Sequence, residues 1–166
     1  MLAPMQGDEL LTRWRKASRS RLGRLAFSRS LGAAVPYTGS IRPEVLSLDA
    51  GRAEVGMNDR RRVRNHLKSV HAIALVNLGE VASGLALLTG LPPTLRGIVK
   101  GLSIEYHKKA RGRLVASCIA ELPEDEDEDE QDVTVVARIR DAIGDIVATV
   151  EVRWRVGPVP RKEARP

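Results

Sequence analysis

The longest apolar stretch of the chain runs from Ala72 to Leu88 and contains only three polar side chains. These are Asn77, Glu80 and Ser83, spaced three residues apart, so that on an α-helix they form one narrow stripe. A helix that is apolar on nearly every side is typical of a protein core. The pattern therefore predicts a central buried helix, and a carboxylate inside it needs a partner, water or a chemical role.

Beyond this helix the period of the apolar positions changes from 3.6 to 2, which is typical of strands with one buried face. Four segments show it, at about 98–107, 113–121, 133–140 and 146–156, and two shorter extended segments precede the helix, at 43–48 and 52–57. We expect an α+β fold in which an antiparallel sheet of about six strands wraps around one long central helix.

An imperfect apolar stripe in the first 25 residues predicts one extra, basic N-terminal helix; it comprises Leu10, Leu11, Trp14, Leu22 and Leu25. The Gly- and Pro-containing stretch at 28–40 is expected to be a connector. The predicted organisation is therefore a helix and connector over residues 1–35, the main domain over 36–157, and a disordered tail over 158–166.

Composition fits one soluble globular domain, because the 166 residues are 43% hydrophobic and 29% charged. The one cysteine, Cys118, excludes an internal disulfide framework and suits a reducing cytoplasm. Three scattered histidines do not indicate a metal site. The apolar stretch is at the lower length limit for a membrane span and carries Glu80, which disfavours membrane insertion.

The net charge of +6 is unevenly spread along the chain. Residues 1–31 hold seven Arg and Lys, whereas Glu124 to Glu130 is an unbroken acidic run that we expect to be a solvated loop. With only 3% aromatic residues and no recognised motif, nucleic-acid binding is not expected. A basic peripheral protein, whose N-terminal helix contacts an anionic membrane or nucleic acid, remains one alternative function.

Three polar residues around the start of the predicted helix carry a resemblance. Asn65 precedes His71 by six residues, and Glu80 follows His71 by nine. This spacing resembles the acyl-CoA thioesterases of the PaaI-like class, which have the hotdog fold, and the segment 104–112 also resembles the strand and turn after the helix there. The resemblance covers about residues 40–156, and the nearest relatives form a bacterial hotdog family of unknown function.

Two departures from that class bear on turnover. Where the class has Gly-Gly after the histidine, this chain has Ala72-Ile73, whose backbone turns less freely. The strand position that often carries a catalytic Ser or Thr falls near Val99, which has no hydroxyl.

The spacing of His71 and Glu80 has a geometric consequence of its own. Nine helical residues rotate about 900° and rise about 13.5 Å, so the two side chains lie on opposite faces and cannot act on one bond within one chain. If they cooperate, two chains must meet. The resemblance implies a homodimer, or a dimer of dimers, in which sheets join edge to edge and paired sites lie at the interface.

The resemblance also implies roles for these residues in thioester hydrolysis. The amides of His71 and Ala72, at the helix N-terminus, would hold the negative charge that develops on the thioester carbonyl. Glu80 of the other chain would be the general base on water, or else the nucleophile. Asn65 would orient substrate or water. No cofactor is needed, since coenzyme A is part of the substrate.

Substrate contacts are expected from basic and polar residues near this site. Coenzyme A phosphates would lie near basic side chains that follow the predicted strand at 98–107, or near the cluster of arginines at 60–64. The candidates are Lys108, Lys109, Arg111 and Arg64. Asn77 and Ser83 are candidates from the polar stripe, although a packing or hydrogen-bonding role explains Ser83 better than substrate binding does.

Structural roles remain open for the same residues. Glu80 can be a buried carboxylate satisfied by Asn77 or by backbone, and His71 and Asn65 can be helix and turn caps. Three functions follow: an acyl-CoA thioesterase, a non-catalytic acyl-CoA or fatty-acid binding protein on the same scaffold, and the basic peripheral protein.

Overall fold

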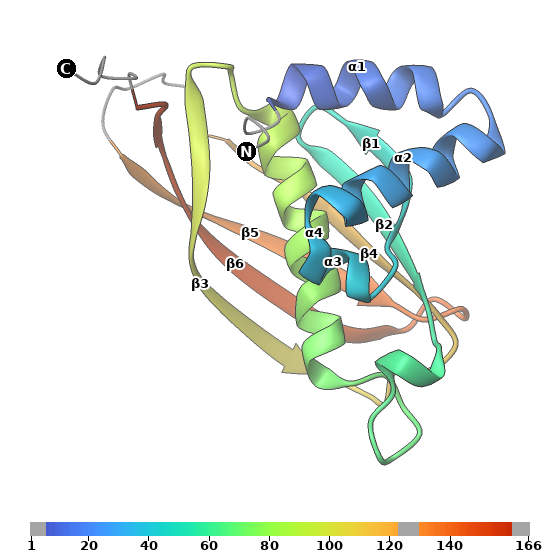
Figure 1. Ribbon diagram of the computed structural model, residues 1–166. Helices are drawn as coiled ribbons and strands as arrows, with labels where there is room; N and C mark the ends of the chain where they lie inside the picture. The colour runs from blue at the N-terminus through green and yellow to red at the C-terminus, as the bar shows by residue number, and fades with distance from the viewer. Residues whose placement is uncertain (1–5, 123–129, 161–166) are drawn as a thin grey trace.

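The computed structural model describes residues 6–122 and 130–160 as a curved sheet around one long helix (Figure 1). The helices are α1 (Gly7–Ala17), α2 (Arg21–Ala34), α3 (Pro36–Ser40) and α4 (Ala72–Gly90), with a short 3-10 turn, η1 (Arg61–Val63), before α4. The strands are β1 (Glu44–Asp49), β2 (Arg52–Asn58), β3 (Leu95–Tyr106), β4 (Arg113–Ile119), β5 (Gln131–Arg140) and β6 (Ile146–Pro158). The α+β class and the central helix predicted from the periodicity are both confirmed.

The six strands form one antiparallel sheet in the order β1-β2-β4-β5-β6-β3. The edges are therefore β1 and β3, and β6 pairs with β3 and β5 on its two sides. Inward residues of β6 such as Val150 and Val152 are wholly buried, while the residues that follow each of them, Glu151 and Arg153, are exposed. This alternation is the period of two that predicted the strand.

The helix α4 lies deep in the sheet because a glycine removes the side chain at the closest contact. A Cβ on Gly79 would lie 2.5 Å from a methyl carbon of Val150 on β6. One turn later on the helix, Gly84 has room, since a Cβ there would lie 3.4 Å from the Trp154 ring. Gly79 thus sets the distance between α4 and the sheet.

The N-terminal segment differs from the prediction, because the expected connector at 28–40 is helical. The predicted single helix is instead two helices, α1 and α2. The side chain of Ser20 between them accepts a hydrogen bond from the Gly23 amide and caps α2. The rings of Trp14 and Phe27 then join the two helices edge to face, with centroids 5.2 Å apart. Leu22 is 79% exposed, so the single stripe through Leu22 and Leu25 was wrong.

The helix α1 uses its apolar side for the domain itself. Leu10, Leu11 and Trp14 are buried, and Gly7 at its start approaches the Leu88 carbonyl so closely that any side chain would clash. The apolar face that membrane binding would need is therefore already covered.

The two predicted flexible segments lie mainly outside the described residues. All of the acidic run except Glu130 falls at 123–129, and the tail falls largely at 161–166. The start of that tail was placed too early, because Pro158 ends β6 and the Val159 amide donates to the Thr94 carbonyl at 2.8 Å.

The two edge strands of the sheet differ in what packs against them. α2 packs along β1, and the edge amide of Val45 donates to the Ser28 hydroxyl at 2.9 Å. β3, at the opposite edge, has no strand or helix on its outer side within the described residues (Figure 1). Only one edge of the sheet is therefore open to pairing.

We expect Gly79→Ala to destabilise the protein by up to about 2 kcal/mol. The added methyl group overlaps Val150, and overpacking of about 1–3 kcal/mol outweighs the helix propensity of about 1 kcal/mol that alanine gains over glycine. Urea unfolding followed by far-UV circular dichroism measures the difference.

Gly84→Ala is the matched control in the same helix. Its methyl group would make ordinary contact with Trp154, so only the helix propensity should act and stability should rise by up to about 1 kcal/mol. Equal effects of the two substitutions would show that Gly79 does not set the helix position.

Candidate active site

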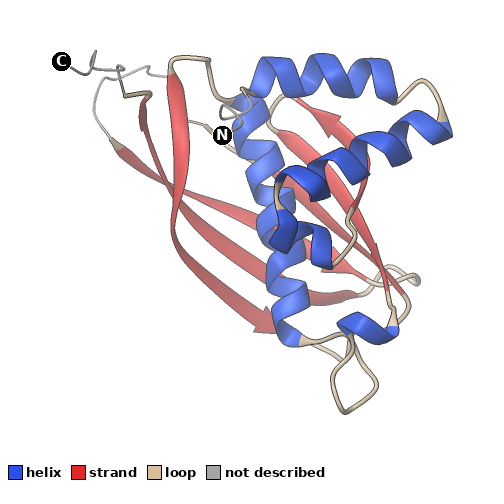
Figure 2. Cartoon of the chain, in the orientation of Figure 1, coloured by secondary structure: helices blue, strands red, loops and turns tan. Residues whose placement is uncertain are grey.

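The helix α4 begins at a tight loop that Asn65 holds together. The Asn65 side-chain oxygen accepts hydrogen bonds from the amides of Leu67 and Ser69 and from the Ser69 hydroxyl, at 2.9–3.2 Å. The backbone amide of Asn65 donates to the backbone carbonyl of Ser69 at 2.8 Å. This loop projects beyond the start of α4 (Figure 2). The carbonyl of the Asn65 side chain is thus committed to the loop, and its NH2 group is what remains for a ligand.

His71 is the N-cap of α4. Its Nδ1 accepts a hydrogen bond from the Ile73 amide at 3.1 Å, so in the neutral ring the proton is on Nε2. Its backbone amide donates to the Val63 carbonyl at 2.7 Å. Of the two amides expected to hold an oxyanion, the one of His71 is therefore occupied.

The backbone amide of Ala72 donates no hydrogen bond within the described residues, as is usual for the first amides of a helix. It lies at the positive end of a 19-residue helix, where backbone dipoles favour negative charge.

Glu80 is half-buried, and nothing described here satisfies its carboxylate. No hydrogen-bond donor or cation among the described residues lies within reach of its side chain. Burial raises the pKa of Glu80 above its ordinary value of 4.5. The expected alternative, a carboxylate satisfied by Asn77 or by backbone, is not what the structure shows.

Glu80 lies on the face of α4 that is directed toward β3. Ile73 and Val76 share this face of the helix, and Ile73 is 51% exposed. Further along this face, Gly84 and Leu87 approach Trp154 of β6 and Gly97 of β3. This face of α4 is therefore exposed near the start of the helix and covered beyond Glu80.

Apolar side chains of β3 are exposed on the side of the sheet that faces α4. The strand register pairs Leu102 with Val152 and Tyr106 with Ala148, whose side chains are wholly buried toward α4. Cross-strand partners share a face, so Leu102 and Tyr106 also face the α4 side. They are nevertheless 46% and 48% exposed, because α4 does not cover this part of the sheet.

An unsatisfied hydrogen-bond donor is buried near Gly84, one turn beyond Glu80. Trp154 is 5% exposed, and its indole N–H has no hydrogen-bond partner among the described residues. Its strand neighbour is Val99, the position near which the related class often has a hydroxyl. Sequence reasoning missed Trp154, whose only signal was its place in the alternating pattern of the last strand.

Asn77 and Ser83, the other members of the polar stripe, make contacts inside the protein. The Asn77 side chain donates to the Tyr37 carbonyl at 3.2 Å and so fastens α3 to α4. The Ser83 hydroxyl donates to the Glu80 carbonyl at 2.9 Å and is wholly buried. Both side chains are buried within one chain, and their predicted substrate contacts remain untested.

The basic candidates fall into two groups. Arg64 pairs with Asp59 at 2.6 Å, and Lys108 pairs with Asp141 and Asp145 at 2.8 and 2.6 Å. Hydrogen bonds to these two carboxylates raise the pKa of Lys108. Both cations are thus neutralised within the chain.

Lys109 and Arg111 are exposed and lie close to the loop before α4. The Arg111 guanidinium donates to the Lys68 carbonyl at 3.5 Å, and the neighbouring Ala110 carbonyl accepts from the Val70 amide. They form no ion pair with the described residues, so they are available to an anionic ligand.

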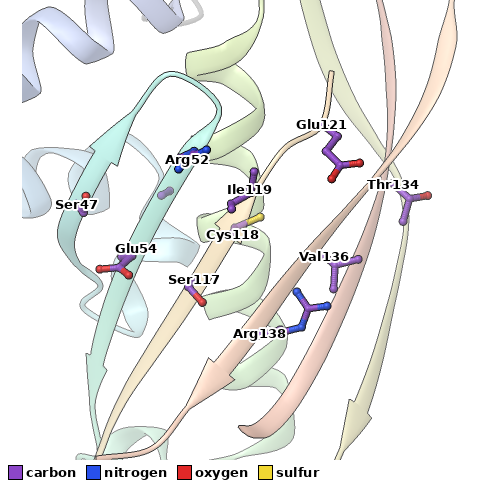
Figure 3. A pocket seen from close by; sticks show the side chains of 11 residues that line it. Ser47, Arg52, Glu54, Ser117, Cys118, Ile119, Glu121, Thr134, Val136 and Arg138 are labelled. Carbon is purple, nitrogen blue, oxygen red and sulfur yellow. The ribbon is translucent and has the colours of Figure 1, made fainter. Parts of the chain in front are cut away.

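A hollow of about 540 Å³ lies on the outer face of the sheet, the face directed away from α4 (Figure 3). Its exposed side chains include Arg52, Glu54 and Arg138, which alternate with residues buried toward α4. This hollow is therefore separated from Glu80 by the sheet itself.

Neither a metal centre nor a reactive thiol emerges from the described residues. No group of three or more His, Cys, Asp or Glu side chains gathers there as metal ligands. Burial raises the pKa of the Cys118 thiol to about 12, so it is not a nucleophile at neutral pH. The one described helix long and apolar enough to span a membrane is α4, which is mostly buried inside the domain.

Comparison with known proteins identifies the family. A family model described as "Domain of unknown function (DUF4442)" matches residues 23–156. The chain belongs to this family. No match is found among functionally curated proteins.

Solved structures show the same fold. A crystal structure named genomics APC5556 is 28% identical, with a TM-score of 0.76 over 90% of this chain and 98% of that one. The probable thioesterase PA5026 from Pseudomonas aeruginosa is 20% identical, with a TM-score of 0.68 over 80% and 91%. The thioesterase HI1161 from Haemophilus influenzae is 13% identical, with a TM-score of 0.71 over 84% and 94%. PA5026 and HI1161 are thus named as a probable thioesterase and a thioesterase, and the hotdog fold expected from the Asn65, His71 and Glu80 spacing is confirmed.

We expect Glu80→Gln to stabilise the protein at neutral pH but not in acid. A carboxyl whose pKa is raised by burial favours the folded state only while it is protonated, and this contribution is lost as pH rises through its folded pKa. The variant and parent should therefore be similar below about pH 4.5, and the variant should gain on the parent above it.

Urea unfolding of both proteins between pH 4 and 8 measures this difference. Carboxyls common to the two proteins cancel, so the slope belongs to residue 80. A difference in unfolding free energy that does not change with pH would contradict the buried, unsatisfied state of Glu80.

Proposed function

We propose that this protein hydrolyses acyl thioesters, coenzyme A thioesters in particular, at a site completed by a second copy of the chain. The observation that carries the proposal is Glu80: a half-buried carboxylate without a partner among the described residues, on the helix face that carries the exposed Ile73, whose pKa is raised by burial toward that of a useful base. The likeness to structures named as thioesterases supports it.

The chemistry needs only groups that this chain supplies. Glu80 takes a proton from a water molecule whose oxygen attacks the thioester carbonyl carbon, and the Ala72 amide holds the resulting oxyanion. The C–S bond then breaks, and the thiolate leaves with the proton that Glu80 had taken. Thioester and water become carboxylic acid and thiol. The Asn65 NH2 group is placed at the same helix terminus and would orient the water or the carbonyl.

The two main groups cannot meet on one thioester within one chain. The helix α4 is continuous from Ala72 to Gly90, so the Ala72 amide and Glu80 remain about 12 Å apart along its axis. A second chain brings its own Ala72 to the first chain's Glu80. The open edge β3 is the surface for this pairing, because its apolar side chains Ile98, Leu102 and Tyr106 are about half exposed.

We infer that the acyl chain lies in a groove between α4 and β3. The exposed apolar side chains Ile73 on α4 and Leu102 and Tyr106 on β3 would line it, and Trp154 would close its end. The thiol end of the substrate would leave toward the start of α4, where Lys109 and Arg111 are free to contact coenzyme A phosphates. The paired state of Arg64 and Lys108 makes these two less suited to that role.

A non-catalytic binding protein is the second candidate function. It is favoured by Val99, which supplies no hydroxyl beside the groove, and by the Asn65 side-chain oxygen, which is fully used by the loop. Such a protein would bind the same thioesters without turnover.

A reducing cytoplasm is the compartment we propose. The single thiol, Cys118, is buried and free, and nothing in the described residues requires oxidising conditions.

We expect Glu80→Gln to lose at least about a hundredfold in turnover while still folding and binding acyl-CoA. General-base catalysis contributes roughly 10²–10⁴ in rate, and glutamine cannot accept the proton. A free-thiol assay over a panel of acyl-CoAs measures turnover, and Glu54→Gln on the outer face of the sheet is the matched control.

Mixed dimers sharpen this test. Chains carrying Glu80→Gln, mixed with chains disabled at Asn65, should regain about one intact site per mixed dimer if the two residues act from different subunits. Parental turnover by Glu80→Gln would instead exclude the catalytic role and leave the binding protein.

We expect the protein to be a dimer that depends on β3. Leu102→Asp should give a folded monomer without thioesterase activity, because it places a charge on the exposed apolar edge and removes the second chain. Leu46→Asp on β1, an edge that α2 covers, is the control and should remain dimeric. Sedimentation equilibrium at micromolar concentration measures both. A parent protein that is a stable, folded monomer would contradict the two-chain site.

A further inference from the structure

A cavity of about 800 Å³ lies between the N-terminal helices and the start of the sheet. Its walls come from the second half of α2, from α3, from the start of β1 and from the segment between β2 and η1. The two helices approach closely at Gly32 and Gly39, since a Cβ on Gly39 would lie 2.4 Å from the Gly32 carbonyl oxygen. The cavity is thus built by this packing and does not depend on a single loop.

Four arginines line this cavity, namely Arg29, Arg42, Arg60 and Arg62. The one acidic residue in its lining, Glu44, is already used, because it pairs with Arg113 at 2.6 Å and accepts from the Asn58 side chain at 3.1 Å. Arg29, Arg42 and Arg62 form no ion pair with any described residue. The cavity therefore holds uncompensated positive charge.

Arg60 is fixed in place and close to its neighbours. Its guanidinium donates to the Ile41 carbonyl at 2.8 Å, at the end of α3. Burial, together with repulsion from Arg42 and Arg62, lowers the pKa of Arg60. Arg42 and Arg62 thus lie near enough to Arg60 for their charges to repel it.

Arg42 is held in an unfavourable backbone conformation. Its φ is +51°, in the left-handed region, at the position after the end of α3 where helices usually have glycine. A side chain there adds strain that glycine would avoid. The arginine places a fourth guanidinium in the cavity at the expense of local stability.

We propose that this cavity binds the phosphate groups of a small phosphorylated ligand. Guanidinium groups bind phosphate through paired, charge-assisted hydrogen bonds, and several converging arginines match a diphosphate or a phosphate monoester better than a single carboxylate. The volume falls within the range of small-molecule sites. The apolar side chains of Leu25, Ala33 and Pro36 in the same lining would contact the non-phosphate part.

Two sources can supply this chemistry: a soluble phosphate ester, such as the nucleotide end of a coenzyme, or the headgroup of an anionic lipid. The proposal does not depend on thioester hydrolysis, because phosphate binding is measured without a thioester. Either activity can therefore be absent while the other is present.

The test is calorimetric titration of the full chain with inorganic pyrophosphate. We expect saturable binding of one pyrophosphate per chain, weakened about tenfold or more by Arg29→Gln or by Arg62→Gln, since each removes a charge-assisted hydrogen bond. Arg19→Gln changes the net charge equally at an exposed position outside the cavity and should bind like the parent.

Arg42→Gly separates binding from folding. It should weaken pyrophosphate binding to a similar extent while leaving the melting temperature unchanged or higher, because glycine relieves the left-handed backbone. Loss of affinity with a preserved fold cannot then be attributed to unfolding.

Two further titrations identify the source. Adenosine 3′,5′-bisphosphate binding more tightly than pyrophosphate, with the same sensitivity to Arg29→Gln, indicates a soluble nucleotide. Vesicles containing phosphatidic acid that bind the parent but not Arg29→Gln indicate a headgroup. The proposal is overturned if pyrophosphate does not bind saturably, or if Arg19→Gln weakens binding as much as the cavity variants do.

Discussion

The depth at which α4 lies in the curved sheet determines most other features of this protein. Gly79 allows the helix backbone to approach β6 at Val150, where any side chain would overlap a methyl group. With α4 this close, its apolar faces are buried and the three N-terminal helices have only one side of it to cover. Glu80 follows Gly79 directly, so its half-buried position results from the same close contact that stabilises the core.

The N-terminal helices change the hotdog scaffold in two ways. They cover the β1 edge, where Ser28 accepts the hydrogen bond from the Val45 amide that a neighbouring strand would otherwise take. They also create the arginine-lined cavity, since α2 and α3 meet through Gly32 and Gly39. The two sides of α4 therefore differ: Glu80 is on the side directed toward β3 of the sheet, while the cavity depends on the N-terminal helices.

Local patterns predicted the local elements, and contacts between distant residues were beyond them. The periods of 3.6 and 2 located α4 and all six strands to within a few residues. The break between α1 and α2 was missed because Leu22 continued the spacing set by Leu10 and Trp14, although Ser20 is a good helix cap. That Ser20 signal could have divided the helix.

The candidate site was predictable only in part for the same reason. The positions of Asn65, His71 and Glu80 follow from their spacing around a helix start. The partner of Asn77 is a backbone carbonyl 40 residues away, and Lys108 meets Asp141 and Asp145 because β3 and β6 are neighbours in the sheet. Which cations are already neutralised depends on the strand order, which the apolar pattern does not specify.

The unequal sheet edges also limit how far the protein can assemble. A sheet with two open edges can add copies without end and grow into a fibre. Here one edge carries a helix, so the proposed strand pairing through β3 would use up the open edge of both partners at the first step. The helix α2 over β1 would therefore prevent open-ended polymerisation. The long edge strand β3 can then remain exposed in the monomer.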